Sequence, residues 1–196
     1  MEMNNNVLIV GNDPKLISGV TNYTRPLGEQ LLESGVNVSY LFSSSYTEEI
    51  DFGKMHLEKY TENNITHHKL INSKGLVFNY DQLDIDYSNW FNFKFKNLLK
   101  ENKINIIHIH EMIGISSNII KTAKSMNIKV FVTVHEYWWL CPHKVMVDFN
   151  GKICNGPTDR KKCAYCIHKK LPFFNTSYLK NNYRIKTVLP LFHKLL

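Results

Sequence analysis

Short apolar runs alternate along the chain with segments whose apolar residues recur at helical spacing. The runs predict buried strands at Val7–Val10, Val36–Phe42, Ile65–Ile71, Ile104–His110 and Lys129–Val134. The helical spacing predicts three helices between them, with apolar faces running from Val20 to Leu31, from Trp90 to Leu99 and from Ile115 to Met126. Strands and helices that alternate in this way predict an α/β fold with a doubly wound parallel sheet.

Parts of this pattern leave more than one interpretation. Pro26 interrupts the first helix, which either starts near Thr24 or starts near Gly19 and is kinked; a kinked or late start is expected. Ser43–Lys59 is polar and predicts a loop with a short helix. A last helical stripe predicts a C-terminal helix at residues 175–196, and residues 1–196 are expected to form one domain.

The net charge of +7 comes mostly from lysine, because arginine occurs only at Arg25, Arg160 and Arg184. Proteins that read base sequences favour the bidentate contacts of arginine, so no nucleic-acid partner is expected. No apolar stretch approaches the ~20 residues that cross a bilayer, and the N-terminus lacks the basic and apolar parts of a signal peptide. We therefore expect a cytoplasmic protein, in which cysteines are usually not paired in disulfides.

The four cysteines lie in residues 137–174, a segment without clear periodicity. They are Cys141, Cys154, Cys163 and Cys166, and the last two form a CxxC pair. Four thiolates can close a tetrahedral structural zinc site, and a metal would organise an irregular segment of this length. Unliganded reduced thiols and a redox CxxC are the alternatives, and His143 or His168 can replace a thiol as a ligand.

Polar residues follow three of the predicted strands at their carboxyl ends, which is the edge where open parallel sheets bind ligands. They are the loop from Gly11 to Gly19, His110 with Glu111, and His135 with Glu136. The loop matches neither the dinucleotide fingerprint nor the P-loop, although a glycine before a helix allows an anion or a sugar to approach backbone amides. His135 directly follows VFVTV, where a neutral imidazole can hydrogen-bond a substrate hydroxyl or a phosphate. A histidine that only caps a loop is the alternative.

Several segments, taken in order, resemble the N-terminal domain of family 4 glycosyltransferases, which are retaining enzymes of the GT-B fold. The matching segments are VLIVGN, SGVTNYTRPLGEQLLESGVNVSYL, INIIHIHEMIG, KVFVTVHEYWWLCP and the tail GKICNGP…CAYC. The resemblance implies a Rossmann-like, acceptor-side half of a GT-B enzyme, with a cysteine-rich irregular insertion after the last strand. It also implies that Gly19 lies near the donor's phosphates, that His135 contacts the transferred sugar as a catalytic residue, and that His110 is a polar position of the same edge. Ser18 replaces the first of the family's usual two glycines.

For function, the resemblance implies transfer of a hexosyl group from a nucleotide-sugar to a glycan or lipid-linked acceptor, with retention and without a catalytic cofactor. Such enzymes build polysaccharides, glycolipids and glycoproteins. Glu111 and Glu136 would contact the acceptor. The donor-binding C-terminal domain is expected beyond Leu196, and the chain alone is therefore expected to be inactive.

Two further expectations concern partners. The late lysines and arginines, beside Phe173 and Phe174, would rest peripherally on an anionic inner-membrane face that carries lipid-linked acceptors. The alternative to an enzyme is a zinc-stabilised α/β binding module whose cysteine loop contacts an acidic partner. A second series of strands and helices downstream of Leu196 would favour the transferase.

Overall fold

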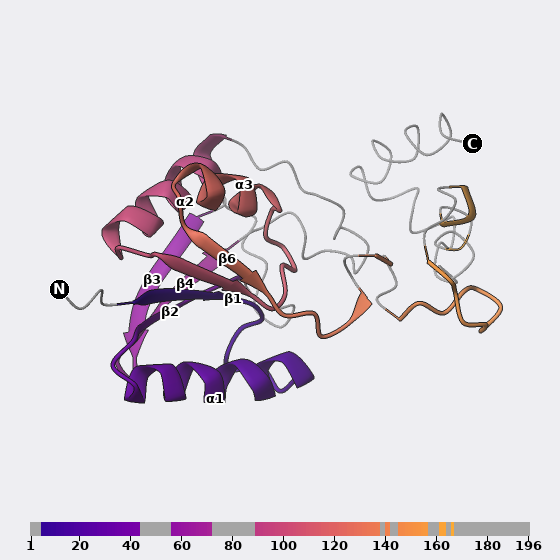
Figure 1. The fold of residues 1–196 in the computed structure, drawn as a ribbon, viewed down its shortest axis with the longest axis horizontal. Helices are drawn as coiled ribbons and strands as arrows, with labels where there is room; N and C mark the ends of the chain where they lie inside the picture. The colour runs from indigo at the N-terminus through magenta and orange to yellow at the C-terminus, as the bar shows by residue number, and fades with distance from the viewer. Residues whose placement is uncertain are drawn as a thin grey trace, which may run out of the picture. The chain divides into compact units, whose positions relative to one another are not determined.

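The computed structural model describes residues 5–43, 56–71, 89–137, 140–141, 145–156, 161–163 and 166. Its centre is a six-stranded sheet with the strand order β3-β4-β2-β1-β5-β6. The strands are β1 (Asn6–Val10), β2 (Asn37–Ser43), β3 (His56–Glu62), β4 (Ile65–Ile71), β5 (Ile106–Ile109) and β6 (Lys129–Val132). The helices are α1 (Gly19–Glu33), α2 (Asn89–Glu101) and α3 (Asn118–Ser125). In Figure 1, α1 covers one face of the sheet while α2 and α3 cover the other, so the doubly wound α/β arrangement is confirmed.

The sheet is mixed rather than wholly parallel, which corrects the sequence prediction. The edge strand β3 pairs antiparallel with β4, whereas the other pairs are parallel. β3 occupies part of Ser43–Lys59, where a loop and a short helix were expected; residues 44–55 lie outside the described part of the chain. The two strands are joined by Asn63 and Asn64, whose φ angles of 50° and 62° are typical of a tight hairpin turn.

The core lies around the central strand β1. Leu8, Ile9 and Val10 have no exposed surface, as expected for a parallel strand with helices on both faces. The apolar face of α2 is confirmed as core, because Phe91 and Phe95 are both 1% exposed and their rings stack with centroids 6.0 Å apart.

β6 differs from its predicted burial. The apolar run indicated a buried strand that continues to Val134, but the strand ends at Val132. Phe131 is 53% exposed and Val134 63% exposed. The reason is position, because β6 is the outermost strand of the sheet beyond β5.

Helix α1 begins at Gly19. Of the two starts considered because of Pro26, near Thr24 or near Gly19, the structure therefore has the earlier one, which gives the longer helix. Its N-cap is Ser18, whose hydroxyl accepts a hydrogen bond from the Thr21 amide at 3.1 Å. The Thr21 hydroxyl in turn accepts one from the Ser18 amide at 2.9 Å, which completes a capping box. Pro26 lies inside the helix on an exposed position, where water can replace the hydrogen bond that proline cannot donate.

The chain divides into two compact units, residues 1–135 and 136–196. The sheet and the three helices belong to the first unit. The described part of the second unit contains a bridge between Val147 and Ile153, and the predicted helix at 175–196 lies outside the described residues. Among the described helices, none is long and apolar enough to cross a membrane.

Two adjacent histidines of β4, His67 and His68, are buried in the sheet. His67 lies between the rings of Tyr40 and Tyr60, with nearly parallel planes and centroids 5.4 and 4.8 Å away. Burial is the largest cause that lowers the pKa of His68 to about 4, and burial also lowers the pKa of His67. Both imidazoles are therefore neutral at physiological pH.

The capping box predicts that Ser18→Ala destabilises the protein. The substitution leaves the Thr21 amide without its acceptor, and loss of such a cap costs about 1 kcal/mol. Urea unfolding of Ser18→Ala should therefore give a lower midpoint at an unchanged slope. Ser18→Gly should lose only a few tenths of a kcal/mol, and equal losses in the two variants would contradict the assignment of the cap.

The buried histidines predict a loss of stability in acid. Unfolded histidine titrates near pH 6.5, whereas His68 in the folded chain has a pKa of about 4. Between these values the unfolded chain binds more protons, so the free energy of unfolding falls as the pH is lowered, by up to about 1.4 kcal/mol per pH unit for each such histidine. Urea titrations between pH 7 and 4 measure this slope. His68→Leu should flatten it, and a slope unaffected by that substitution would contradict the assignment.

Candidate active site

The strand order reverses between β1 and β5. In open α/β sheets, ligands bind at the carboxyl ends of the strands beside such a reversal. From β1 the chain continues through β2 to β4 on one side and then returns to β5 on the other. Residues that follow β1 and β5 at their carboxyl ends are therefore neighbours at the switch point. The His110 amide donates to the Val10 carbonyl at 2.8 Å, and the Thr133 amide donates to the Ile109 carbonyl at 2.9 Å.

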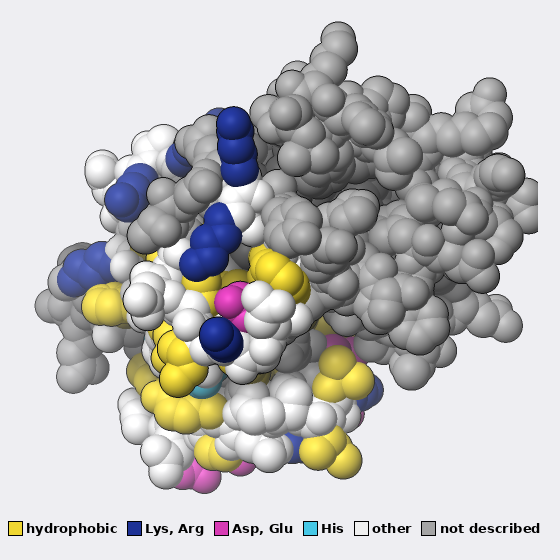
Figure 2. Space-filling model, turned by 90° about the vertical axis from the view of Figure 1, so that its right-hand side faces the viewer, with side chains coloured by type: hydrophobic (Ala, Val, Ile, Leu, Met, Phe, Trp, Pro, Cys, Tyr) yellow, Lys and Arg dark blue, Asp and Glu magenta, His cyan; other side chains and the backbone are white. Residues whose placement is uncertain are grey.

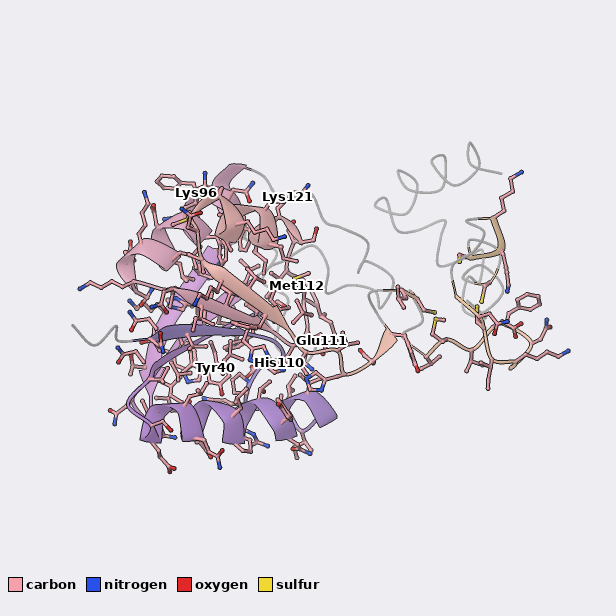
Figure 3. All side chains as sticks on the ribbon, in the orientation of Figure 1. Tyr40, Lys96, His110, Glu111, Met112 and Lys121 are labelled. Carbon is pink, nitrogen blue, oxygen red and sulfur yellow. The ribbon has the colours of Figure 1, made fainter. Side chains whose placement is uncertain are left out.

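This edge brings together two of the histidines predicted from the sequence. His110 Nδ1 lies 2.9 Å from His135 Nε2, which is hydrogen-bonding distance. His110 is 1% exposed, whereas His135 is exposed. Figure 3 shows His110 and Glu111 at this end of the sheet, on the segment that leaves β5.

Burial keeps His110 neutral. It lowers the pKa of His110 to about 3, and the neighbouring imidazoles of His108 and His135 add to the shift. His108 lies on the same face of β5, with its ring centroid 4.1 Å from that of His110, and burial likewise lowers its pKa. His108 Nε2 is held by the Thr133 hydroxyl at 2.8 Å. The edge therefore presents one exposed imidazole, supported by the buried, uncharged ring of His110 and by the half-buried ring of His108.

Tyr23 is a site residue that the sequence reasoning missed. The helical spacing placed it on the buried face of α1, but its side chain is 49% exposed. Its ring centroid lies 5.5 Å from that of His110 and 5.3 Å from that of His135. The sequence could have indicated Tyr23 as a site residue, because it lies in the first turns of a helix that begins at the ligand edge.

Exposed apolar side chains also occur near the start of α1 and after β6. Figure 2 views the molecule from the right-hand side of Figure 1 and shows hydrophobic side chains around a visible histidine. Among the exposed apolar residues of the first unit, Leu16 and Ile17 belong to the loop before α1 and Val134 follows β6; Ile17 is 91% exposed. An apolar group of a ligand would find surface of the same kind there.

The start of α1 has two residues with different local roles. Ser18 uses its hydroxyl and amide in the capping box, so the serine in place of a family glycine has a structural reason. Gly19 has no such reason: a Cβ added to it would meet no atom within 4 Å, and its φ is not in the left-handed region. The amides of Gly19 and Val20 make no hydrogen bond within the described part of the chain and lie at the positive end of the helix dipole.

The two predicted acidic residues are placed differently. Glu111 directly follows His110, but its side chain is only 3% exposed. Glu136 is half-buried and is the first residue of the second unit. The assignment of both as acceptor contacts stays a prediction.

The cysteines all belong to the second unit and are free thiols, each half-buried. Burial is the first cause that raises the pKa of the Cys163 thiol, and the thiols of Cys154, Cys141 and Cys166 follow as further causes. The sulfurs of the other three cysteines therefore lie within electrostatic range of Cys163. Among the described residues, no three histidine, cysteine or acidic side chains are already arranged as a ligand set for a metal ion.

Comparison with solved structures gave distant likenesses. An E. coli structure described as trehalose-6-phosphate bound with UDP-2-fluoro glucose aligns with 67% of this chain and 33% of its own, at 13% identity and a TM-score of 0.36. An α,α-trehalose-phosphate synthase (UDP-forming) from Burkholderia xenovorans aligns over 66% and 32% of the two chains, at 7% identity and a TM-score of 0.35. The corresponding protein from Burkholderia vietnamiensis gives 67% and 33%, at 8% identity and a TM-score of 0.36. The chain thus spans about one third of the length of these structures.

Comparison by sequence gave one informative result. No curated protein sequence matches the chain significantly. The family model described as Glycosyltransferase Family 4 matches residues 17–157, which include the start of α1, both site histidines and two of the cysteines. The chain therefore belongs to glycosyltransferase family 4.

Proposed function

We propose that this chain is the acceptor-side half of a GT-B enzyme that transfers a hexosyl group from a nucleotide-sugar to a glycan or lipid-linked acceptor, with retention. The activity would serve the synthesis of polysaccharides, glycolipids or glycoproteins. Membership of the family supports sugar transfer. The residues that meet at the carboxyl edge of the sheet support donor binding at that edge. The proposal places His135 against the transferred sugar and Gly19 against the donor's phosphates.

The observation that carries the proposal is the unexplained glycine at the start of α1. Glycine is usually required by a positive φ or by close packing of neighbouring atoms, and neither applies at Gly19. By contrast, a Cβ at Gly28 would clash with the Tyr40 hydroxyl, so that glycine is explained by packing of α1 on β2. Approach of a ligand to the backbone is the remaining reason for Gly19, and unpaired amides at a helix N-terminus favour a negatively charged ligand.

The chemistry of this edge fits donor binding better than complete catalysis. An imidazole at His135 can hydrogen-bond a sugar hydroxyl, and the amides at Gly19 and Val20 can hydrogen-bond a phosphate oxygen. None of Ser18, Gly19, Tyr23, His110 and His135 carries the fixed positive charge that a departing diphosphate needs. We therefore propose that the cation comes from a second, donor-binding domain and that this chain alone does not turn over.

The acceptor would lie beside the start of α1. The exposed apolar residues Leu16 and Ile17 next to the capping box would suit the apolar part of a lipid-linked acceptor. Peripheral binding to an anionic membrane face would bring the enzyme to such acceptors. Most of the late basic residues invoked for that contact, and Phe173 and Phe174, lie outside the described residues.

Substitution of Gly19 tests the donor site. Gly19→Ala should leave the thermal midpoint unchanged or slightly raised, because its methyl group meets no protein atom. The same methyl group should weaken nucleotide-sugar binding by about fivefold or more, since it occupies the path of the phosphate. Titration of the ¹⁵N-labelled chain with a panel of nucleotide-sugars, followed by NMR, measures both the affinity and the residues perturbed.

The matched control is Gln30→Ala, an exposed change about three turns further along α1 that should not affect binding. Equal affinity of wild type and Gly19→Ala, or no perturbation by any nucleotide-sugar at millimolar concentration, would refute the donor site. In a form of the enzyme that turns over, His135→Ala should lower turnover by about tenfold or more, the effect of one lost hydrogen bond in the transition state.

We also propose that Cys141, Cys154, Cys163 and Cys166 bind one structural zinc ion. Three observations support the site. Cys154 follows a β-bridge in which its amide donates to the Met146 carbonyl at 2.8 Å, Cys163 and Cys166 are three residues apart in the sequence, and all four thiols are half-buried. Zinc would replace the mutual repulsion of neighbouring thiolates by coordination and would draw the four sulfurs into a tetrahedron.

The zinc proposal predicts one metal ion per chain. Elemental analysis of protein purified without chelator should find zinc near one equivalent, and a chelator should lower the thermal midpoint. Cys163→Ser should lose most of the metal, whereas Lys152→Ala, an exposed change in the same segment, should retain it. Metal-free protein of unchanged stability would leave the cysteines as ordinary reduced thiols.

A further inference from the structure

The bond between His110 and His135 constrains where their protons lie. A contact of 2.9 Å between two ring nitrogens needs one proton between them, carried by either Nδ1 of His110 or Nε2 of His135. His110 is neutral, so it holds a single ring proton. The two arrangements therefore differ in which nitrogen of His135 is left to meet a ligand.

The buried side of His110 distinguishes the two arrangements. Its Nε2 is buried and has no hydrogen-bond partner among the described residues. If His110 accepted the bond at Nδ1, its own proton would sit on Nε2 as a buried donor without an acceptor. If His110 donates from Nδ1, only an acceptor is left unpaired at Nε2. Unpaired buried donors are the rarer of the two in native structures, so the second arrangement is favoured.

The rings around the pair restrict its rotation. Tyr23 contacts both imidazoles from α1, and the ring of His108 lies against His110 with centroids 4.1 Å apart. His108 is itself held by its bond to the Thr133 hydroxyl. A rotation of His110 that broke its bond to His135 would have to displace these neighbours.

We propose that His110 is a positioning residue that donates its Nδ1 proton to Nε2 of His135 and so leaves His135 with a proton on Nδ1, as the donor offered to a ligand oxygen. His110 does not touch the ligand in this arrangement. Its effect is to select the tautomer and the ring orientation of the exposed imidazole. The identity of the ligand oxygen, a hydroxyl of the donor sugar, rests on the proposed function.

Ring-nitrogen NMR of the ¹⁵N-labelled chain tests the tautomer directly and needs no substrate. At pH 7, Nε2 of His135 should have the chemical shift of an unprotonated nitrogen and Nδ1 that of a protonated one, with His135→Ala identifying the signals. His110→Phe keeps a ring in place but removes the bond, and the two nitrogens of His135 should then show the averaged shifts of a free imidazole. His110→Asn retains an N–H near the position of Nδ1 and should restore the wild-type pattern.

Two results would overturn the proposal. One is a protonated Nε2 of His135 in the wild-type chain, and this spectrum decides even if neither variant folds. The other is a pattern that His110→Phe leaves unchanged.

Nucleotide-sugar binding separates this inference from the proposed function. His110→Phe should weaken binding about tenfold, as expected for one displaced hydrogen bond. His110→Asn and His56→Phe, a control on the edge strand β3, should stay within about threefold of wild type. If the tautomer is as stated but no nucleotide-sugar binds, the proposed function fails and the positioning role stands. If nucleotide-sugars bind His110→Phe as tightly as wild type, the positioning role fails and the function stands.

Discussion

The parallel pairing of β1 with both β2 and β5 is the constraint on which the rest of the structure depends. β1 is fully buried on both faces and has a strand on each side, so the chain has to leave it at the carboxyl end and return to the sheet over alternate faces. The Gly11 amide binds the Leu41 carbonyl, and the His110 amide binds the Val10 carbonyl. These bonds hold the ends of three strands side by side. The burial that stabilises the sheet thus also assembles the ligand edge.

The central part of the fold is predictable from the sequence because burial on both faces leaves an uninterrupted apolar run. Val7–Val10 and Val36–Phe42 match β1 and β2 to within a residue at either end. β3 carries no such run, because an edge strand with an exposed face tolerates Glu58 and Lys59, and its only local signal was the Asn63–Asn64 turn. The apolar run at β6 correctly predicted a strand but not the exposure of its side chains. An apolar run does not show whether a strand lies in the middle or at the edge of a sheet.

The candidate site was predictable as a set of positions but not as a set of contacts. His110 and His135 were placed at the ligand edge by the rule that polar residues at carboxyl ends of strands converge. The 2.9 Å bond between them depends on the register of β5 and β6, in which Ile109 lies opposite Val132, and no local pattern gives that register. Tyr23 was missed because helical spacing gives the relative phase of residues on α1, but not how the first turn lies against the end of the sheet.

The buried histidines show why an unusual environment alone does not identify a functional residue. His67, His68 and His110 are all buried, all have a lowered pKa, and each keeps one ring nitrogen without a partner among the described residues. The first two lie within β4, and His67 is enclosed by tyrosine rings. His110 instead follows β5, and its other nitrogen is bonded to an exposed imidazole at the edge where α1 begins. Burial removes charge from His110 and fixes its ring, and only this bond transmits that fixed orientation to a group that a ligand can reach.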